Sequence, residues 1–571
     1  MEGDLKEEKP SIHADLQTHL LNDNNNHVQK GGLRTMPFII VNEAFEKVAS
    51  SGVMANMIFY LMEVYHMEAV TGTSVIYIWS ALSDGLSIFG AFVSDSYFGR
   101  FRVIAFGSLS SLVGVSLLWL TSIVPQLTPS SASSCPPTPA QLGFLLASFS
   151  LISIGSGCIR PCSIVFGADQ LKHYNSQRLI DSYFNWYYAS STISYIIAST
   201  VVVYIQDLFG WRVGFAVPVL VMLCSALMFL LGSSLYVKVE VKKSPFSGLI
   251  QVLAVAFKNR KIRLLPGDCY NHSNEMDRVE LTDNLRFLNK ACVVRDVNIG
   301  SIGSNPCGVP TVEKVESLKT LIRIIPIWSS GILLFTITVQ NFPTLQAKKM
   351  NRNITSWFEI PAASFILFEL LTITIWIPFY DCILDKLLAK YTNEPRGLNL
   401  KTRMGIGLIL SVITMVVSAI VETIRRDLAN QNTPFNMSAM WLVPQYVLLG
   451  LSVAFNDIGQ IEFYYSELPK SMASFSIAVL KVSAASGSLV ASLLTNIVDS
   501  VTGRGGNVSW LSSDIDEGHV DYYYWLLSFL SLLNFFYYLI CCRVHRSFSS
   551  SECRLSHAVN IEGSDSIEDK L

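Results

Sequence analysis

Apolar stretches long enough to cross a lipid bilayer recur along the whole chain. The hydrocarbon core of a bilayer is about 30 Å thick, so a spanning helix that rises about 1.5 Å per residue needs about 20 predominantly apolar residues. We count twelve such stretches, which predict twelve transmembrane helices and an all-α membrane protein. They begin near Pro37, Gly72, Val103, Leu142, Tyr183 and Val213 in the first half of the chain, and near Leu318, Ile360, Met404, Trp441, Ser474 and Tyr522 in the second.

The composition supports a membrane protein and excludes several other classes. Hydrophobic residues make up 50% of the chain and charged residues only 15%, whereas soluble domains carry about 25% charged residues. The formal net charge of −2 provides no electrostatic basis for nucleic-acid binding. Since no phosphate-binding glycine loop, nucleophile elbow or Cys/His metal spacing occurs, we expect no enzymatic activity, no metal and no cofactor.

The distribution of lysine and arginine predicts the orientation in the membrane. Most of these residues in the loops fall in alternate connections, on the side that also carries both termini. Because cytoplasmic loops are enriched in lysine and arginine, this side is predicted to be cytoplasmic. Six basic residues are exceptions on the opposite side: Lys348, Lys349, Arg352, Arg425, Arg426 and Arg504.

A long hydrophilic stretch divides the predicted helices into two sets of six. We expect a flexible cytoplasmic N-terminus at 1–30, a first six-helix half at 31–237, a central cytoplasmic linker at 238–316, a second half at 317–546 and a flexible tail at 547–571. This organisation resembles that of major facilitator carriers, in which the substrate site lies near the bilayer midplane between the halves.

Three ionisable side chains lie inside the first predicted span. Glu43, Glu46 and Lys47 are spaced i, i+3 and i+4 and therefore share one face of a helix. A charge at membrane depth costs about 2.5–3.5 kcal/mol on insertion scales, so three together need partners or a water-filled cavity. The cluster favours the ion-coupling machinery of a transporter. The alternative is a static Glu–Lys pair that extends to the membrane surface.

Five further ionisable residues lie within the predicted spans. Counting about 1.5 Å per residue places two of them in the cytoplasmic half of the membrane and three near its middle. Carboxylates and cations at similar depth can pair across a central cavity, and an exchange of partners would couple protonation to gating. Alternatively, Asp84 and Glu369 are satisfied by local packing, and Arg160, which precedes a proline, marks a helix break. The residues are Arg160 and Asp457 in the cytoplasmic half, and Asp84, Glu369 and Lys481 near the middle.

Several ordered motifs resemble the proton-dependent oligopeptide transporters. Glu43-x-x-Glu46-Lys47 is similar to the ExxER motif of that family, and GSGCIRPC at 155–162 with FGADQ at 166–170 matches its GGGxKP…FGADQ segment. The similarity runs from residue 31 to 546 and points to the plant nitrate and peptide transporter family. The set is completed by GAFVSDSYFGR at 90–100, which resembles the segment closing the second helix, and by FNWYY at 184–188 and GQIEFY at 459–464.

The resemblance implies roles for individual residues. It assigns Glu43, Glu46 and Lys47 to proton coupling. It assigns Arg160, at the position of the family's Lys, to substrate contact or to a salt bridge between the halves. Arg for Lys keeps the charge but changes its geometry and makes deprotonation unavailable. In the 90–100 segment, the candidate gating or structural residues are Asp95, Gly99 and Arg100.

The tenth predicted helix departs from the family pattern. Val453 stands where the family usually has the Glu that pairs with the cation of the fourth helix. Asp457 lies one turn later on the same face, about 6 Å along the helix, and we expect it to take over this role. Lys481 on the eleventh helix is also unusual. In the alternative, Asp457 and Lys481 neutralise each other and leave Arg160 without a partner in the other half.

Thr338 stands where a nitrate-binding member of the family has a His. Its hydroxyl can donate one hydrogen bond to an anion but supplies no titratable positive charge. Nitrate binding by the His mechanism is therefore unsupported. A cavity lined by Arg160 instead favours an anionic or carboxylated solute in general.

These observations predict a proton-coupled secondary transporter that works by alternating access. The expected partners are protons, membrane lipid and a small anionic or carboxylated solute of the nitrate, plant hormone or peptide class. Two alternatives are a ligand-binding membrane sensor and a uniporter or exporter without proton coupling. The plasma membrane is the expected location, with the vacuolar membrane as the alternative, and the oligomeric state stays open.

Overall fold

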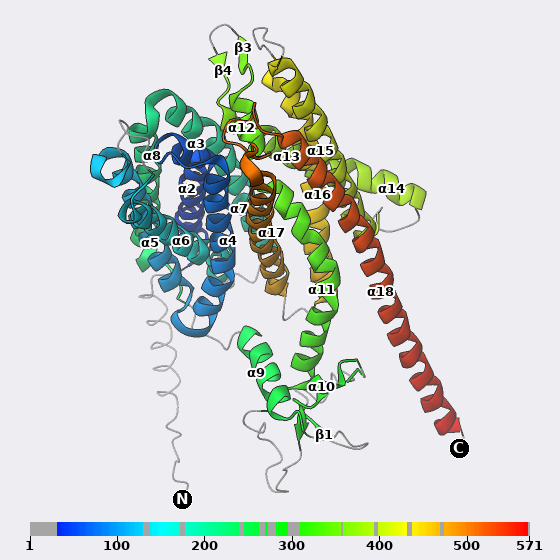
Figure 1. The fold of residues 1–571 in the computed structure, drawn as a ribbon. Coiled ribbons are helices and arrows are strands. Elements are labelled where there is room, and N and C mark those ends of the chain that lie inside the picture. The colour runs from blue at the N-terminus through cyan, green and yellow to red at the C-terminus, as the bar shows by residue number, and fades with distance from the viewer. Residues whose placement is uncertain are drawn as a thin grey trace, which may run out of the picture.

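The computed structural model describes residues 31–129, 136–171, 177–238, 245–261, 269–271, 281–282, 284–294, 309–355, 358–392, 398–430, 437–468 and 473–568. Within them the chain is almost entirely helical (Figure 1). Only two short antiparallel strand pairs occur in the described part. They are β1 (Cys269–Tyr270) with β2 (Val293–Val294), and β3 (Asn353–Thr355) with β4 (Phe358–Glu359).

Six long helices from the first part of the chain pack together, and we call them the first helix group. Short segments extend or connect them: η1 (Leu33–Thr35), α3 (Met57–Glu63), η2 (Ser94–Phe98), η3 (Pro125–Leu127), η5 (Ala198–Val202) and η6 (Gly232–Ser234). The group consists of α2 (Met36–Ala55), α4 (Ala69–Val93), α5 (Arg100–Ile123), α6 (Pro139–Leu171), α7 (Gln177–Ile197) and α8 (Val203–Leu231).

Small residues allow the helices of this group to approach closely. A side chain at Gly90 on α4 would collide with the carbonyl oxygen of Gly157 on α6. A Cβ at Gly155 would lie 2.7 Å from the carbonyl oxygen of Gly107 on α5. Lipid chains are as apolar as the helix surfaces, so such close packing is a main source of helix association in a membrane.

The fifth and sixth predicted spans are joined without a loop. Helical structure runs from α7 through η5 into α8, and the chain bends at Gly210, where φ is 75° and ψ is 178°. Glycine adopts this backbone conformation without the steric clash that a Cβ would cause.

Six further long helices form the second helix group. Short segments accompany them: α12 (Phe342–Lys348), η7 (Ala362–Phe365), η8 (Tyr380–Leu384), α14 (Asp385–Thr392), η9 (Ala439–Leu442) and η11 (Arg504–Gly506). The group consists of α11 (Val312–Thr338), α13 (Ile366–Phe379), α15 (Leu400–Ala429), α16 (Val443–Glu467), α17 (Ala473–Thr502) and α18 (Val520–Glu568). The two groups meet mainly where α4 packs against α17.

Ten helical segments of the described chain are long and apolar enough to cross a membrane. One of them, 178–234, is 57 residues long and contains both α7 and α8. The first helix, α2, is not among the ten and carries three ionisable residues. The twelve predicted spans therefore correspond to the six long helices of each group.

The two ends of the bundle differ. The end that carries α9 (Pro245–Lys258) and α10 (Arg286–Asn289) is called the inner end here, and the end that carries β3 and β4 the outer end (Figure 1). Apolar residues of α9 and α10 pack against the start of α11, so these parts of the predicted linker cover the second group. Helix α18 continues to Glu568, and the flexibility of the tail stays a prediction.

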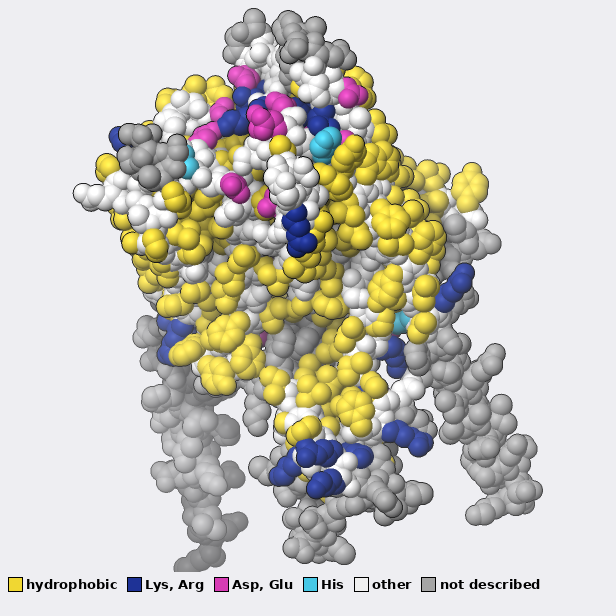
Figure 2. Space-filling view, in the orientation of Figure 1, with side chains coloured by type: hydrophobic (Ala, Val, Ile, Leu, Met, Phe, Trp, Pro, Cys, Tyr) yellow, Lys and Arg dark blue, Asp and Glu magenta, His cyan; other side chains and the backbone are white. Residues whose placement is uncertain are grey.

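Carboxylates neutralise most of the basic residues that are exceptions to the orientation pattern. Figure 2 shows lysine, arginine and acidic side chains intermingled at the outer end, above a broad hydrophobic surface. Arg425 is the most enclosed, with a side chain that is 0% exposed. The pairs are Lys348 with Glu63, Lys349 with Asp514 and Asp516, Arg352 with Glu359, Arg425 with Glu422 and Asp516, and Arg426 with Asp521.

Candidate functional site

The two carboxylates of the first helix are enclosed within the first helix group. Glu43 and Glu46 on α2 are each 1% exposed, because α2 packs against α6, α7 and α8. Within the described part of the chain, no hydrogen bond of good geometry reaches either carboxylate oxygen of Glu43 or the Oε1 atom of Glu46. Both carboxylates are enclosed by helices of their own group, and the alternative of a static Glu–Lys pair at the membrane surface stays a prediction.

Lys47 lies in a polar and aromatic enclosure beside them. Its Nζ is 3.4 Å from Oε1 of Glu43 and donates a hydrogen bond to Ser191 on α7. The rings of Tyr187 and Tyr195, also on α7, have their centroids 5.9 and 5.5 Å from this nitrogen. Aromatic rings at such distances attract a cation. Helix α7 therefore holds the ammonium group that α2 provides.

Arg160 on α6 binds the same carboxylate cluster. Its Nε lies 3.5 Å from Oε2 of Glu46, and its Nη2 donates a hydrogen bond to Ser50 at 2.9 Å. Helix α6 continues through Pro161, so the alternative of a helix break at this point is wrong. In this conformation the guanidinium pairs within its own helix group and forms no salt bridge to the described residues of the second group.

The ion pair between the groups is formed by Lys481 and Asp84. Nζ of Lys481 on α17 donates a hydrogen bond to Oδ1 of Asp84 on α4 at 2.9 Å. Counting residues along the predicted spans had placed both residues near the middle of the membrane. The alternative in which Lys481 pairs with Asp457 is not realised in this conformation, since no ion pair joins these two described residues.

A row of hydrogen bonds continues from this ion pair toward the outer end. Moving outward along α4, each contact reaches a partner in the second group, on α17, after α11 or in the loop before α18. Among the described residues, the innermost polar contact between the groups is the one between Asp84 and Lys481. The others join Ser80 to Ser488, Tyr77 to Gln340 and to the backbone nitrogen of Asn341, Ser74 to Asn496, and the backbone nitrogen of Ala69 to Ser513.

Asp457 on α16 lies in the second group and forms no ion pair with any described residue. Its Oδ1 is buried and accepts no hydrogen bond, although the charge of Lys481 acts on the carboxylate. Val453, one turn earlier, packs against the apolar core. The expected role of Asp457 as partner of Arg160 stays a prediction, because Arg160 binds Glu46 in this conformation.

A cavity of about 170 Å³ lies between the two groups. Tyr77 of the first group and Gln340, Glu369 and Gln445 of the second line it, and neither amide atom of the Gln445 side chain has a hydrogen-bond partner among the described residues. Thr338 also lines the cavity, but its hydroxyl donates to the Leu334 carbonyl of its own helix at 3.0 Å. Unpartnered polar atoms of this kind are available to a polar solute or to water.

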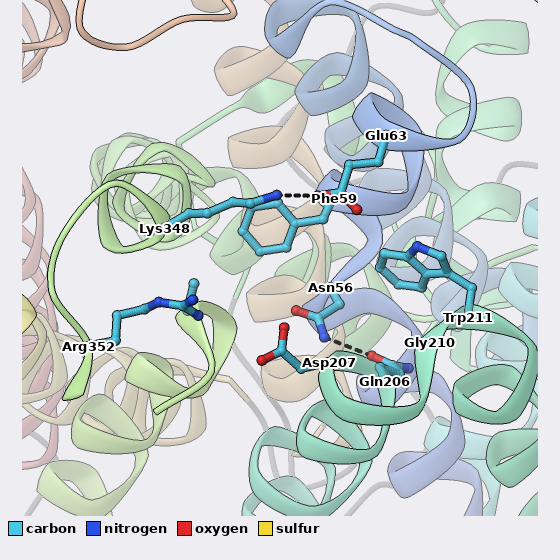
Figure 3. A pocket seen from close by; sticks show the side chains of 10 residues that line it. Asn56, Phe59, Glu63, Gln206, Asp207, Gly210, Trp211, Lys348 and Arg352 are labelled. Atoms are coloured by element: carbon cyan, nitrogen blue, oxygen red, sulfur yellow. Dashed lines mark hydrogen bonds and ion pairs between the residues drawn. The ribbon is translucent and has the colours of Figure 1, made fainter. Parts of the chain in front are cut away.

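A second pocket of about 160 Å³ lies at the outer end of the interface (Figure 3). Lys348, which follows α11 on α12, crosses to the first group and pairs with Glu63 of α3. Its Nζ also lies 4.5 Å from the ring centroid of Phe59. The pocket is therefore bridged by contacts that hold the outer ends of the two groups together.

The three residues of the 90–100 segment form a structural junction. Gly99 takes φ 78° and ψ 150°, which allows the sharp turn from η2 into α5. Arg100 then pairs with Asp95 (Nη2 to Oδ1, 2.9 Å) and with Asp169 at the end of α6. The junction fixes the inner ends of α4, α5 and α6 relative to each other.

Sequence reasoning missed several residues of the interface. Gln340 accepts hydrogen bonds from Tyr77 and Tyr523 and so joins both groups. Tyr195 lies near three cations, Lys47, Arg160 and Lys481. The sequence shows Gln340 as an amide at the end of a span and Tyr195 as a tyrosine within one. Both features are too common in membrane proteins to mark a functional residue.

Comparisons with known proteins identify the family. The profile of the POT family matches residues 101–511. The Arabidopsis thaliana protein NRT1/PTR FAMILY 1.2 is 46% identical over 544 residues, which cover 90% of this chain and 89% of that protein. NRT1/PTR FAMILY 2.13 of the same plant is 39% identical over 540 residues, with 90% and 87% covered.

Solved structures show the same fold. The POT family transporter PepTSo aligns with a TM-score of 0.69 at 18% identity, over 90% of this chain and 99% of that one. An auto-inhibited POT family peptide transporter aligns with a TM-score of 0.68 at 19% identity, over 89% and 97%. The predicted all-α major facilitator fold is thereby confirmed. By its sequence and its fold, the chain belongs to the POT family of membrane transporters, among the plant NRT1/PTR proteins.

Proposed function

We propose that this chain is a proton-coupled secondary transporter that moves a small anionic or carboxylated solute by alternating access. The observation that carries the proposal is the buried cluster of Glu43, Glu46, Lys47 and Arg160. Two carboxylates and two cations share one enclosed site, and three of the four carboxylate oxygens accept no hydrogen bond of good geometry from the described residues.

Such a cluster suits the uptake and release of a proton. In a low-dielectric site, nearby cations stabilise the charged form of a carboxylate. When the cations move away, the protonated, neutral form is favoured. When Arg160 turns from Glu46 toward a solute, Glu46 loses that support and binds a proton more readily. Proton binding and solute binding then favour each other, which is the thermodynamic requirement of symport.

The cations favour an anionic group on the solute. A guanidinium offers several donors in a fixed plane and matches carboxylate or other oxyanion geometry. Two POT family structures with this fold were solved with 5-aminolevulinic acid and with sulfate, and a carboxylate or an oxyanion is the chemistry that we propose for this chain. The nitrate, plant hormone and peptide classes all contain members of this kind.

The arrangement of the groups supports alternating access. Polar contacts join the groups from Asp84 to the outer end, where Lys348 binds Glu63. Among the described residues, no polar contact between the groups lies further inward than Asp84. This conformation is thus closed at the outer end, and a transport cycle requires these contacts to break. We propose the plasma membrane as the location, with the vacuolar membrane as the alternative.

Uptake into cells that express the protein tests the proposal. Nitrate, dipeptides and labelled hormones should be compared at acidic and neutral pH, with Glu46→Gln as the test variant and Glu68→Gln, at an exposed position, as the matched control. We expect uptake of at least one solute to rise at acidic pH, and this rise to disappear in Glu46→Gln alone. Uptake that is indifferent both to pH and to Glu46→Gln would contradict the proposal.

Val453 favours a second candidate, a sensor or a carrier without proton coupling. An apolar residue stands where the family usually has a Glu, so one coupling carboxylate is absent from that position. A solute that binds the purified protein but is not taken up at any pH would support the sensor. Uptake without pH dependence would support the uncoupled carrier.

A further inference from the structure

Lys481 depends on one carboxylate from the opposite helix group. In the structure it pairs with Asp84 of α4 at 2.9 Å. The other ionisable groups that face it are Tyr195 from α7 and Arg160 from α6, and Asp457 of α16 within its own group. Asp84 is therefore its one ion-pair partner among the described residues.

This partner is lost when the groups separate. Asp84 and Lys481 lie on α4 and α17, which form the main contact between the groups (Figure 1). Opening the outer end of the molecule moves α4 away from α17. Lys481 would then be left with an uncompensated charge at membrane depth, which costs about a hundredfold or more in the population of that state.

Asp457 is placed to replace Asp84. It lies on α16, which packs against α17 in the same helix group, so it moves together with Lys481. Its Oδ1 atom is buried and has no hydrogen-bond donor. The other carboxylate that acts on it is Glu369 of α13, which cannot compensate its charge. A buried carboxylate oxygen without a donor, within electrostatic reach of a cation that is bound elsewhere, is an incomplete site in this conformation.

We propose that Lys481 exchanges carboxylates during the transport cycle: it binds Asp84 while the outer end is closed and Asp457 when the outer end opens. This inference rests on the alternating access of the proposed function. The flexible four-carbon stem of lysine provides the reach that such an exchange requires. Asp457 thus acts on the balance between the two conformations through Lys481, and not through Arg160.

A distance measurement across the outer end tests the exchange without any solute. Glu68 and Glu517 are exposed at the outer ends of the first and second groups. Spin labels on unnatural amino acids at these positions report a short distance when the outer end is closed and a longer one when it is open. The purified full-length protein in lipid nanodiscs serves as the sample.

The two carboxylates have opposite expected effects. Asp84→Asn should increase the population with the long distance relative to the population with the short distance by about 5-fold or more. Asp457→Asn should decrease this population ratio by a similar factor. Asp427→Asn, at an exposed position of α15, is the matched control and should change nothing. In a Lys481→Met background the effect of Asp457→Asn should disappear, since the cation through which it acts is absent.

Two results would overturn the proposal. One is an Asp457→Asn protein whose distances match those of the unchanged protein while Asp84→Asn shifts them. The other is an effect of Asp457→Asn that persists in Lys481→Met. Because these distances do not depend on proton-driven uptake, a failure here is distinguishable from a failure of the proposed function, which would leave uptake independent of pH.

Discussion

Arg160 on α6 and Glu46 on α2 face each other within one helix group, with Nε 3.5 Å from Oε2. The cation that was expected to contact substrate or to bridge the two groups is therefore held by the carboxylate of the first helix in this conformation. Its second contact, from Nη2 to Ser50 at 2.9 Å, uses another edge of the guanidinium. Two contacts in different directions distinguish arginine from lysine at this position.

The exchange Arg160→Lys should therefore lower transport even though it restores the residue that is usual in the family. An ammonium group on a shorter stem can replace one of the two contacts but not both. The loss of one hydrogen bond to a charged group, about 1.5 kcal/mol, predicts a roughly tenfold lower uptake. Initial rates at equal surface expression measure this, with the exposed Arg178→Lys as the control. An Arg160→Lys protein with full activity would show that the geometry of the guanidinium is unimportant.

The enclosure around Lys47 predicts an unfavourable Lys47→Arg substitution. The site is bounded by Ser191 and by the rings of Tyr187 and Tyr195, and a larger planar head group has to displace one of them. Overpacking of this kind costs about 1–3 kcal/mol, so uptake should fall about tenfold or more.

A double-mutant cycle separates overpacking from a general need for lysine. In Lys47→Arg/Tyr195→Leu the space vacated by the ring should restore part of the lost uptake, giving a coupling between the two sites. Additive effects of the two substitutions would contradict the enclosure as the cause.

The number of helices and the position of the first-helix cluster could be predicted from the sequence. The pairing of the charged side chains could not. Apolar length and charge cost act locally along the chain, so they predict the spans and single out Glu43, Glu46 and Lys47. Counting the rise per residue along each span then placed Asp84 and Lys481 at the same depth in the membrane. It does not show which residues pair. Which cation binds which carboxylate depends on the rotation of each helix about its axis and on the separation of the two groups.

The close packing of the helices and the bends within them could not be predicted from the sequence either. The sharp bend between the fifth and sixth spans depends on the backbone of Gly210 within α8, and apolar length alone does not reveal it. The family resemblance also implied that Arg160 contacts substrate or forms a bridge to the second group, and in this conformation the structure shows a contact inside the first group. A carrier that alternates between conformations forms different ion pairs in each of them. A sequence motif is the same in every conformation, so it does not specify which ion pair a given structure contains.

The outer end should lose stability when Arg425 is replaced. Its guanidinium is fully enclosed and holds Glu422 at 2.8 Å and Asp516 at 2.5 Å. Removing one partner of a buried ion pair leaves an uncompensated charge and costs about 3–5 kcal/mol. Arg425→Met should therefore unfold at a clearly lower temperature in detergent. Arg504→Met, at an exposed position, should unfold at the unchanged temperature, and equal unfolding of the two variants would refute this account.

The neighbouring pair of Lys349 and Asp514 predicts a pH dependence of stability. The hydrogen bond from Lys349 holds the pKa of the Asp514 carboxyl below its ordinary value. A group whose pKa is lower in the folded state contributes stability above its unfolded pKa of about 3.9 and loses it as the pH falls through the folded value. The contribution is small, since both side chains are largely exposed to solvent.

Thermal unfolding of Lys349→Met measures this contribution. The variant should be slightly less stable than the unchanged protein near neutral pH, and the difference should vanish at acidic pH. A difference that stays constant from neutral to acidic pH would assign the effect of Lys349 to packing and not to charge.

Proton-driven uptake and solute exchange, compared in the same proteoliposomes, test the central claim most directly. If Glu46 carries the transported proton, Glu46→Gln should abolish uptake driven by a proton gradient. It should retain the exchange of labelled for unlabelled solute, which needs no net proton movement. Loss of gradient-driven uptake with preserved exchange is the predicted result. A Glu46→Gln protein that still accumulates solute in response to the proton gradient would contradict the account.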